Sequence, residues 1–194
     1  DEPWVLSPPT HLKVLRELEA RFATLEADGH TKVRIGVATG NDASYIVSDD
    51  TDIEKDRLVP LVMREDIEAG HLKNGRRFVI NTFDAHGHII ALADYPHLRH
   101  HLEEHVLDIK RRHVAKKNPD SWFRTIDRVY PELVKVPKLL IPDIAGSNEV
   151  ALDKGNYHPH HNLYFVISEA WNMEVLGGLL SSKVALFFIW SYAT

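Results

Sequence analysis

The segment Val33-Arg34-Ile35-Gly36-Val37-Ala38-Thr39-Gly40-Asn41-Asp42 decides which fold class the sequence favours. Its first half alternates apolar residues, at positions 33, 35 and 37, with Arg34 and Gly36, which is the period of a half-buried strand. The polar run from Thr39 to Asp42 breaks this alternation, and apolar residues resume at 45–47. The pattern predicts a strand, a tight loop and a second strand, and a hairpin turn would use the same residues.

Helical periodicity lies on both sides of this segment. Before it, Ser7-Pro8-Pro9-Thr10 offers a cap residue and prolines for a helix start, and apolar residues then recur at helical spacing until Asp28-Gly29, at Leu12, Leu15, Leu18, Phe22 and Leu25. After it, we expect a helix over 96–109 and a largely buried apolar helix over 176–192. Short strands are expected at 77–81, 88–92, 138–144 and 162–167, with Pro142 marking a strand end or a sheet edge.

These elements predict an α+β fold, with a small mixed or antiparallel sheet, flanking helices and a C-terminal apolar helix. No repeat or low-complexity linker divides the chain, so residues 1–194 are expected to form one unit. Within that unit we expect an N-terminal helix in 1–30, an α+β core in 31–170 and the C-terminal helix in 171–194.

Composition places the chain among ordinary globular proteins. It has 194 residues, a formal net charge of -5, 44% hydrophobic residues and 26% charged residues. The absence of cysteine excludes disulfides, thiolate zinc sites and cysteine nucleophiles, and is typical of a reducing cytosol. No apolar run is long enough for a bilayer span, so a cytoplasmic location and no membrane partner are expected. The first residue is not methionine and the last helical stretch lacks a cap, so we expect a fragment of a larger protein.

One part of this acidic chain is strongly basic. Between positions 110 and 138 nine lysines and arginines face only three acidic residues, and Trp122, Phe123 and Tyr130 lie among them. Cations neutralise phosphates and flat rings stack on bases, so this composition is typical of a nucleic-acid footprint. A solvated helix face with core aromatics is the alternative reading.

Histidine is unusually frequent, with 13 residues. His97, His101 and His105 have the spacing of one helical face, and His158, His160 and His161 form a second cluster. Neither cluster contains a His-Glu-x-x-His pattern, so we assign no metal ligand. A metal-dependent hydrolase built on these clusters remains the alternative function.

Catalytic motifs are absent from the sequence. It has no Gly-x-Gly-x-x-Gly, no phosphate-binding lysine loop and no Gly-x-Ser-x-Gly. The acidic residues Asp143 and Glu149 lack the lysine that nuclease chemistry would need at the position two after the glutamate, which is Ala151. We therefore assign no catalytic residue. An interaction domain whose apolar C-terminal helix docks on a partner is a third possibility.

A series of short motifs covers nearly the whole chain: Trp4-Val5-Leu6, Ile35-Gly36-Val37-Ala38-Thr39-Gly40-Asn41-Asp42, Leu58-Val59-Pro60-Leu61-Val62, Asp66-Ile67, Tyr95-Pro96, Arg112-His113-Val114-Ala115-Lys116-Lys117, Trp122, Pro137-Lys138-Leu139-Leu140-Ile141-Pro142-Asp143-Ile144 and Leu176-Gly177-Gly178-Leu179-Leu180-Ser181-Ser182. In this order they resemble the C-terminal specificity domain of TaqI-like, class I N6-adenine DNA methyltransferases, including fused restriction-modification enzymes.

The resemblance implies a target-recognition role. In that family a separate N-terminal domain binds S-adenosylmethionine and holds the flipped adenine with an Asn-Pro-Pro-Tyr/Phe motif. Asn118-Pro119-Asp120-Ser121 matches only its first two letters, so the catalytic domain is absent and no cofactor is expected in this chain. The expected partners are double-stranded DNA and the N-terminal methyltransferase domain of the same parent chain.

The resemblance also places candidate DNA contacts. Thr39, Gly40 and Asn41 match the loop that faces the DNA cleft, and Arg112, Lys116, Lys117 and Lys138 match basic positions of the family. Lysines would contact phosphates, whereas arginine and asparagine side chains can read base edges. The chemistry of the remaining residues adds Trp122, Arg124 and Asn162 as candidates.

Overall fold

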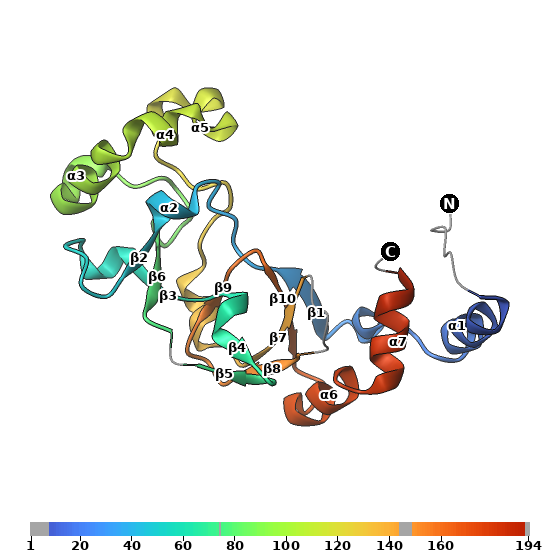
Figure 1. Cartoon of the computed structure of the whole chain (residues 1–194). Helices are drawn as coiled ribbons and strands as arrows, with labels where there is room; N and C mark the ends of the chain where they lie inside the picture. Colours follow the sequence, from blue (N-terminus) through green and yellow to red (C-terminus); the bar gives the residue numbers. More distant parts are fainter. Residues whose placement is uncertain (1–7, 74, 144–148, 193–194) are drawn as a thin grey trace.

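A computed structural model describes residues 8–73, 75–143 and 149–192. It confirms the α+β class, because two four-stranded sheets pack with helices at both ends of the molecule (Figure 1). Ser7 and Ile144, which the sequence places at a helix cap and a strand end, lie outside the described residues.

The first sheet is antiparallel. Its strands are β1 (Thr31–Ile35), β10 (Leu163–Ser168), β7 (Lys138–Pro142) and β8 (Ala151–Asp153), in that spatial order. Leu139, Val166 and Leu176 are buried together between this sheet and α6 (Met173–Leu180). The apolar runs predicted at 138–144 and 162–167 are therefore confirmed as strands of one sheet.

The second sheet is mixed. It contains β2 (Ile46–Ser48), β6 (Arg77–Ile80), β3 (Leu58–Val62) and β9 (His158–Pro159), and only β9 runs parallel to its neighbour, β3. A small hairpin of β4 (Ile67–Glu68) and β5 (His71–Leu72) follows β3, and it turns through Ala69 and Gly70, which have positive φ.

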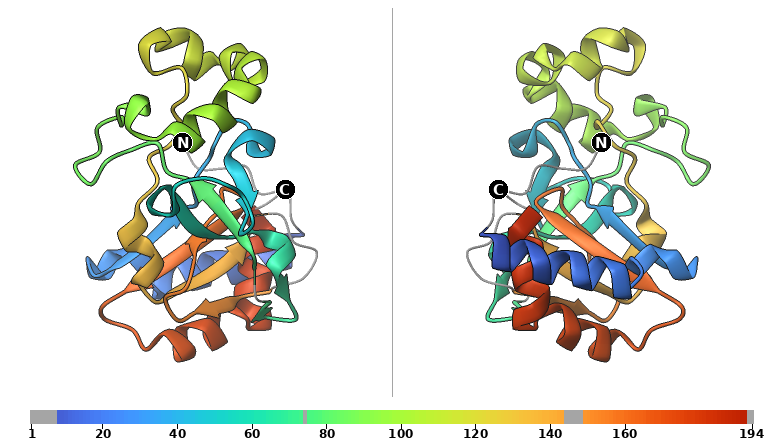
Figure 2. Two further views of the ribbon diagram at one scale, coloured as in Figure 1. Left: turned by 90° about the vertical axis from the view of Figure 1, so that its left-hand side faces the viewer. Right: turned by 90° about the vertical axis from the view of Figure 1, so that its right-hand side faces the viewer.

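Helices lie at the two ends of the molecule (Figures 1 and 2). One end carries α3 (Pro96–Glu104), α4 (Val106–Arg111) and α5 (His113–Lys117), and the other carries α1 (Pro9–Arg21), α6 and α7 (Lys183–Tyr192). The short helix α2 (Asp42–Tyr45) precedes β2. Single 3-10 turns cover Leu25–Asp28, Lys55–Arg57, Arg64–Asp66, Leu92–Asp94, Pro119–Ser121 and Pro131–Lys135.

The lobe formed by α3, α4 and α5 has its own apolar core. Leu98, Leu102 and Ile109 are fully buried, and they pack with Tyr45 of α2 and Phe123. Burial of these apolar side chains is the main force that can hold a small helical lobe on a sheet. The same core fixes α2 and the start of β2 against the lobe.

The expected strand, loop and second strand exist, but they do not form a hairpin. β1 pairs with β10 and β2 pairs with β6, so the two strands belong to different sheets. Ile35, which the alternation places on the buried face, is half exposed at 50%, at the end of the edge strand β1. The segment between them therefore connects the two sheets.

Three further expectations need correction. Residues 88–92 form a single bridge, Phe83 to Ile89, rather than a strand. The helix predicted over 96–109 breaks at His105, and the apolar C-terminal segment is two helices, with Val175, Leu179 and Val184 more than half exposed. The expectation for Pro142 is confirmed in its first form, because Pro142 ends β7, although β7 lies inside the sheet between β10 and β8 and not at its edge. In the part of the chain that the structure describes, every helix is too short or too polar to cross a membrane.

Candidate nucleic-acid interface

The loop of residues 36–42 runs between the two sheets and is held by backbone hydrogen bonds on both sides. Val37 donates to Pro159 and His161 donates to Val37, at 2.9 and 3.0 Å. Gly36 comes so close to the 159–160 backbone that a Cβ atom there would lie 2.3 Å from the carbonyl oxygen of His160. A glycine is required at this position because no side-chain movement could relieve that overlap.

The tip of this loop is ordered by contacts within the loop and with residues 126 and 127. Gly40 has φ 81°, and a Cβ there would meet the side chain of Ile126 at 2.7 Å. The carboxylate of Asp127 accepts from the Ala38 N–H at 2.9 Å. Thr39 is fully buried, donates to Asp42 and accepts from the Asn41 N–H. Thr39 thus shapes the loop, whereas Gly40 is exposed.

Arg112 connects the loop to the helical lobe. Its guanidinium donates to the carbonyl oxygens of Thr39 at 2.8 Å and Arg124 at 2.9 Å, and to the Tyr45 hydroxyl at 2.8 Å. It donates further to Ile109 and Trp122 and lies over the Tyr45 ring. Burial lowers the pKa of Arg112 from its usual value. These bonds correct the expectation that Arg112 reads a base, because its donors are engaged in positioning the loop.

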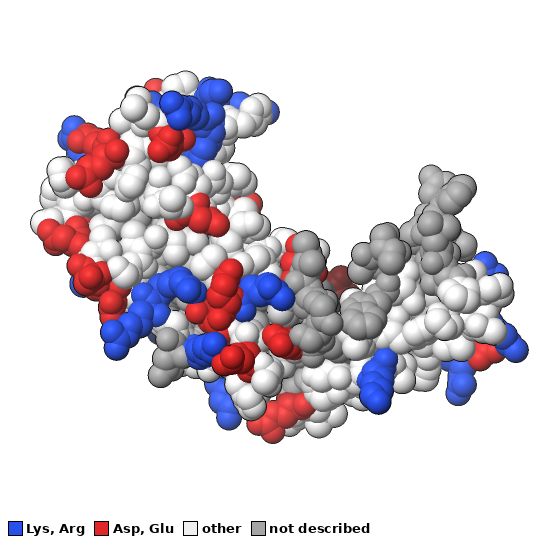
Figure 3. All heavy atoms as spheres, viewed as in Figure 1, with Lys and Arg blue, Asp and Glu red and all other residues white. Residues whose placement is uncertain are grey.

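Lys116 and Lys117 are exposed on the last turn of α5, one turn after Arg112. Lysine and arginine side chains lie together at the top of the lobe to which α5 belongs, with Asp and Glu side chains elsewhere on the same lobe (Figure 3). The surface is hollowed between that lobe and the end formed by α1 and α7 (Figure 3). Lys110 lies over the half-buried Trp122 ring at 5.2 Å from its centroid. The lobe thus combines exposed cations with a partly exposed ring, which suits a phosphate backbone.

The other candidate base readers differ in availability. The side-chain amide of Asn41 makes no hydrogen bond to the part of the chain that the structure describes, whereas Asn162 accepts from the Arg64 N–H at 3.2 Å. Arg124 is half buried, with its guanidinium 5.7 Å from the Phe83 ring and its Nε atom without a partner among described residues. Asn41 is therefore the best placed of the three.

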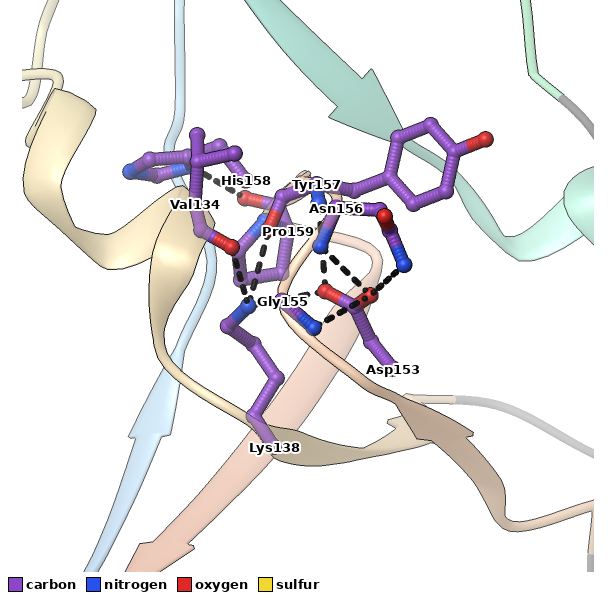
Figure 4. Close-up of polar contacts among 8 residues, drawn as sticks. All are labelled: Val134, Lys138, Asp153, Gly155, Asn156, Tyr157, His158 and Pro159. Atoms are coloured by element: carbon purple, nitrogen blue, oxygen red, sulfur yellow. Dashed lines mark hydrogen bonds and ion pairs between the residues drawn. The ribbon is translucent and has the colours of Figure 1, made fainter.

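Lys138 is not a surface cation, which corrects the sequence-based expectation. Its side chain is fully buried and its ammonium donates to Asp153 at 2.8 Å and to the carbonyl oxygen of Tyr157 at 2.9 Å (Figure 4). Asp153 also accepts from the backbone N–H groups of Gly155, Asn156 and Tyr157. Burial lowers the pKa of Lys138, and the pair makes this residue a structural element beneath β9 rather than a phosphate ligand.

The histidine clusters are rearranged by the fold. The ring of His97 lies 3.0 Å from the Asp52 carboxylate, and the ring of His101 lies 3.0 Å from the carbonyl oxygen of Ser44. The two rings therefore contact other protein groups and not each other. His158 is buried, and its Nδ1 atom lies 3.0 Å from the carbonyl oxygen of Pro159. It therefore contacts the backbone and does not form a cluster with His160 and His161. The rings of His160 and His161 lie 4.1 Å apart between centroids, tilted at 59° to each other, beside Asp42.

Asp127 and Asp42 make contacts to or from the loop that sequence reasoning did not predict. Their partners, Ala38 and His160, are 89 and 118 positions away, so no local spacing could have revealed them. The only available signal was the polar composition of the loop itself.

Comparison with known proteins places this geometry in context. The whole chain is 49% identical to the Type II methyltransferase M.BstVI of Geobacillus stearothermophilus, 45% to M.XhoI of Xanthomonas vasicola and 43% to M.PaeR7I of Pseudomonas aeruginosa. Its relatives are Type II methyltransferases. The chain spans about a third of their length, 34 to 35%. No family model matches the sequence.

A solved structure supports the fold. The Type IIL restriction-modification enzyme MmeI, whose structure was determined in complex with DNA, aligns with 78% of this chain and 20% of its own, with a TM-score of 0.57 and 14% identity. At that identity the likeness shows a shared fold only. The neighbour shows that this fold occurs in one restriction-modification enzyme.

Proposed function

We propose that this chain is the DNA-recognition part of an adenine-specific DNA methyltransferase, or of a restriction-modification enzyme that contains one. Residues 1–194 act as one target-recognition domain, and a separate N-terminal domain of the parent chain binds S-adenosylmethionine and transfers the methyl group. This part of the protein positions the target adenine by holding the surrounding double-stranded DNA.

The observation that carries the proposal is the link between Lys116–Lys117 and the loop through Arg112. Arg112 is the N-cap residue of α5 and donates to the carbonyl oxygen of Thr39. Cations that neutralise phosphates are therefore held at a fixed distance from Gly40 and Asn41, which can approach a base edge. The relatives that match this chain along its whole length are methyltransferases, which is consistent with such a role.

The proposal is tested by the salt dependence of DNA binding. A fluorescent duplex of randomised sequence is titrated with the 194-residue chain at several salt concentrations. Each phosphate contact contributes roughly 0.9 to the slope of log affinity on log salt. We expect the double substitution Lys116→Ala, Lys117→Ala to reduce that slope by about two and to weaken binding to all sequences alike.

The matched control removes two exposed cations from the opposite end of the molecule, Lys13→Ala with Arg16→Ala in α1. That variant is expected to keep the slope of the original chain. Equal slopes in the original chain and the Lys116–Lys117 variant would show that α5 does not contact phosphates. For the original chain, sequencing of the bound duplexes would give the recognition sequence.

A further inference from the structure

His160 is a buried histidine whose ring lacks a hydrogen-bond partner. The residue is 2% exposed, and neither ring nitrogen makes a hydrogen bond to the described part of the chain. Its Nε2 atom lies 3.1 Å from an Asp42 carboxylate oxygen, which is close enough for an ion pair but not aligned for a hydrogen bond. A buried polar group without a hydrogen-bond partner destabilises the fold, so a further partner is expected at this point.

Two other side chains converge on the same point. Asp42, His160 and His161 each place one possible ligand atom within 4.8 Å of the others. His161 is exposed, so its ring can rotate, whereas His160 is fixed by its surroundings. The Asp42 side chain is 41% exposed and accepts from Thr39 through Oδ1, which leaves Oδ2, the oxygen 3.1 Å from His160, for a ligand. Ligands about 2.1 Å from a tetrahedral zinc ion lie roughly 3.4 Å apart, near the 3.1 Å between His160 and Asp42.

We propose that Asp42, His160 and His161 bind a divalent transition-metal ion of the Zn²⁺ type. Two imidazoles and one carboxylate suit Zn²⁺, Co²⁺ or Ni²⁺, whereas Mg²⁺ and Ca²⁺ take oxygen ligands. The ion accepts a lone pair from the buried His160 ring and balances the Asp42 charge. Three protein ligands leave at least one coordination position for water.

The backbone already brings the ligands together. Gly36 donates to Leu163 at 2.9 Å and Val37 is bridged to His160, so the loop and the segment before β10 are joined without the ion. The site would then clamp Asp42, at the end of the loop that carries Gly40 and Asn41, onto that segment. Binding of the ion is independent of whether the chain recognises DNA, so the two proposals can fail separately.

A second group of the same composition serves as a control. His86, His88 and Asp84 also place two imidazoles near a carboxylate, with His88 Nδ1 3.4 Å from Asp84. Their rings are 6.3 Å apart and exposed, and the three are not among the converging groups. Incidental binding to surface histidines would affect this group as much as the proposed site.

The test measures metal uptake by the 194-residue chain, prepared without a histidine tag and treated with chelator. Titration with ZnCl₂, and with CoCl₂ followed by its visible ligand-field spectrum, is expected to give one tight equivalent and a raised melting temperature. His161→Ala and Asp42→Asn should each weaken affinity at least about tenfold. Both variants should fold, because His161 is exposed and an asparagine at position 42 can still accept the hydrogen bond from Thr39.

His88→Ala should leave uptake and melting temperature unchanged. The proposal is overturned if the chain takes up no stoichiometric metal, in which case a buried water satisfies His160. It is equally overturned if His88→Ala weakens binding as much as His161→Ala does.

Discussion

Lys138 and His158 are neighbours in a polar cluster beneath β9 (Figure 4). The His158 ring is buried, with Nδ1 3.0 Å from the Pro159 carbonyl oxygen and Nε2 accepting from the Tyr130 N–H at 3.4 Å. Both contacts fit a neutral imidazole. Burial, helped by the nearby Lys138 charge, lowers the pKa of His158 from 6.5 to about 4.

Acid should therefore destabilise the protein as the pH falls below about 6.5, through His158 alone. Above pH 6.5 the imidazole is neutral in both the folded and the unfolded chain. Between pH 6.5 and about 4 the unfolded chain takes up a proton that the folded chain does not, so the free energy of unfolding falls by about 3 kcal/mol. Urea titrations from pH 7 to pH 4.5 measure this loss.

His158→Leu should flatten that pH dependence while lowering stability at pH 7, because its hydrogen bonds are lost. A wild-type unfolding free energy that stays constant between pH 7 and pH 5 would contradict a neutral buried ring.

Removing the Lys138 charge should cost far more than removing a surface lysine. In Lys138→Met the Asp153 carboxylate keeps its backbone donors but loses its buried cation, and breaking such a pair typically costs about 3–5 kcal/mol. Chemical denaturation measures the difference, with the exposed Lys135→Met as the control. Equal stability of the two variants would mean that Lys138 is not part of the core.

At the scale of elements, the connection between β1 and β2 depends on one close backbone approach. A Cβ atom placed on Gly36 would lie within 2.5 Å of three backbone atoms of residues 159 and 160. Sequence periodicity predicted both strands but not their partners, because strand pairing is settled by contacts between distant segments. The predicted helix over 96–109 divides for the same reason, since burial of Leu102 and Ile109 in one core bends the chain at His105.

Gly36→Ala is expected to destabilise the protein by about 3 kcal/mol or more, because the backbone of residues 159–160 must move. The control is Gly178→Ala in α6, where a Cβ meets nothing within 4 Å. That change should stabilise the helix by up to about 1 kcal/mol. Thermal unfolding of both variants gives the comparison, and a Gly36→Ala variant as stable as the original chain would refute the close approach.

At the scale of the whole molecule, charge is distributed unevenly. The chain is acidic overall, at -5, yet Lys116 and Lys117 are exposed on α5, in a lobe that borders a hollow in the surface (Figure 3). Net repulsion from DNA can therefore coexist with local attraction, because screening confines each charge to about 8 Å at physiological salt. At the end of the molecule opposite the α5 lobe, α1 and α7 pack against each other through the rings of His11 and Phe187.

By itself, the sequence determined the α+β class, most strands, the basic segment and the likeness to DNA methyltransferases, since these depend on local periodicity and residue order. The tertiary structure alone decided which polar residues are free. Lys138 and Arg112 carry the same charge as Lys116, but burial pairs the first with Asp153 and the second with loop carbonyls. Asp42 and His160 meet across 118 positions for the same reason, because burial is a property of the packed chain and not of any local segment.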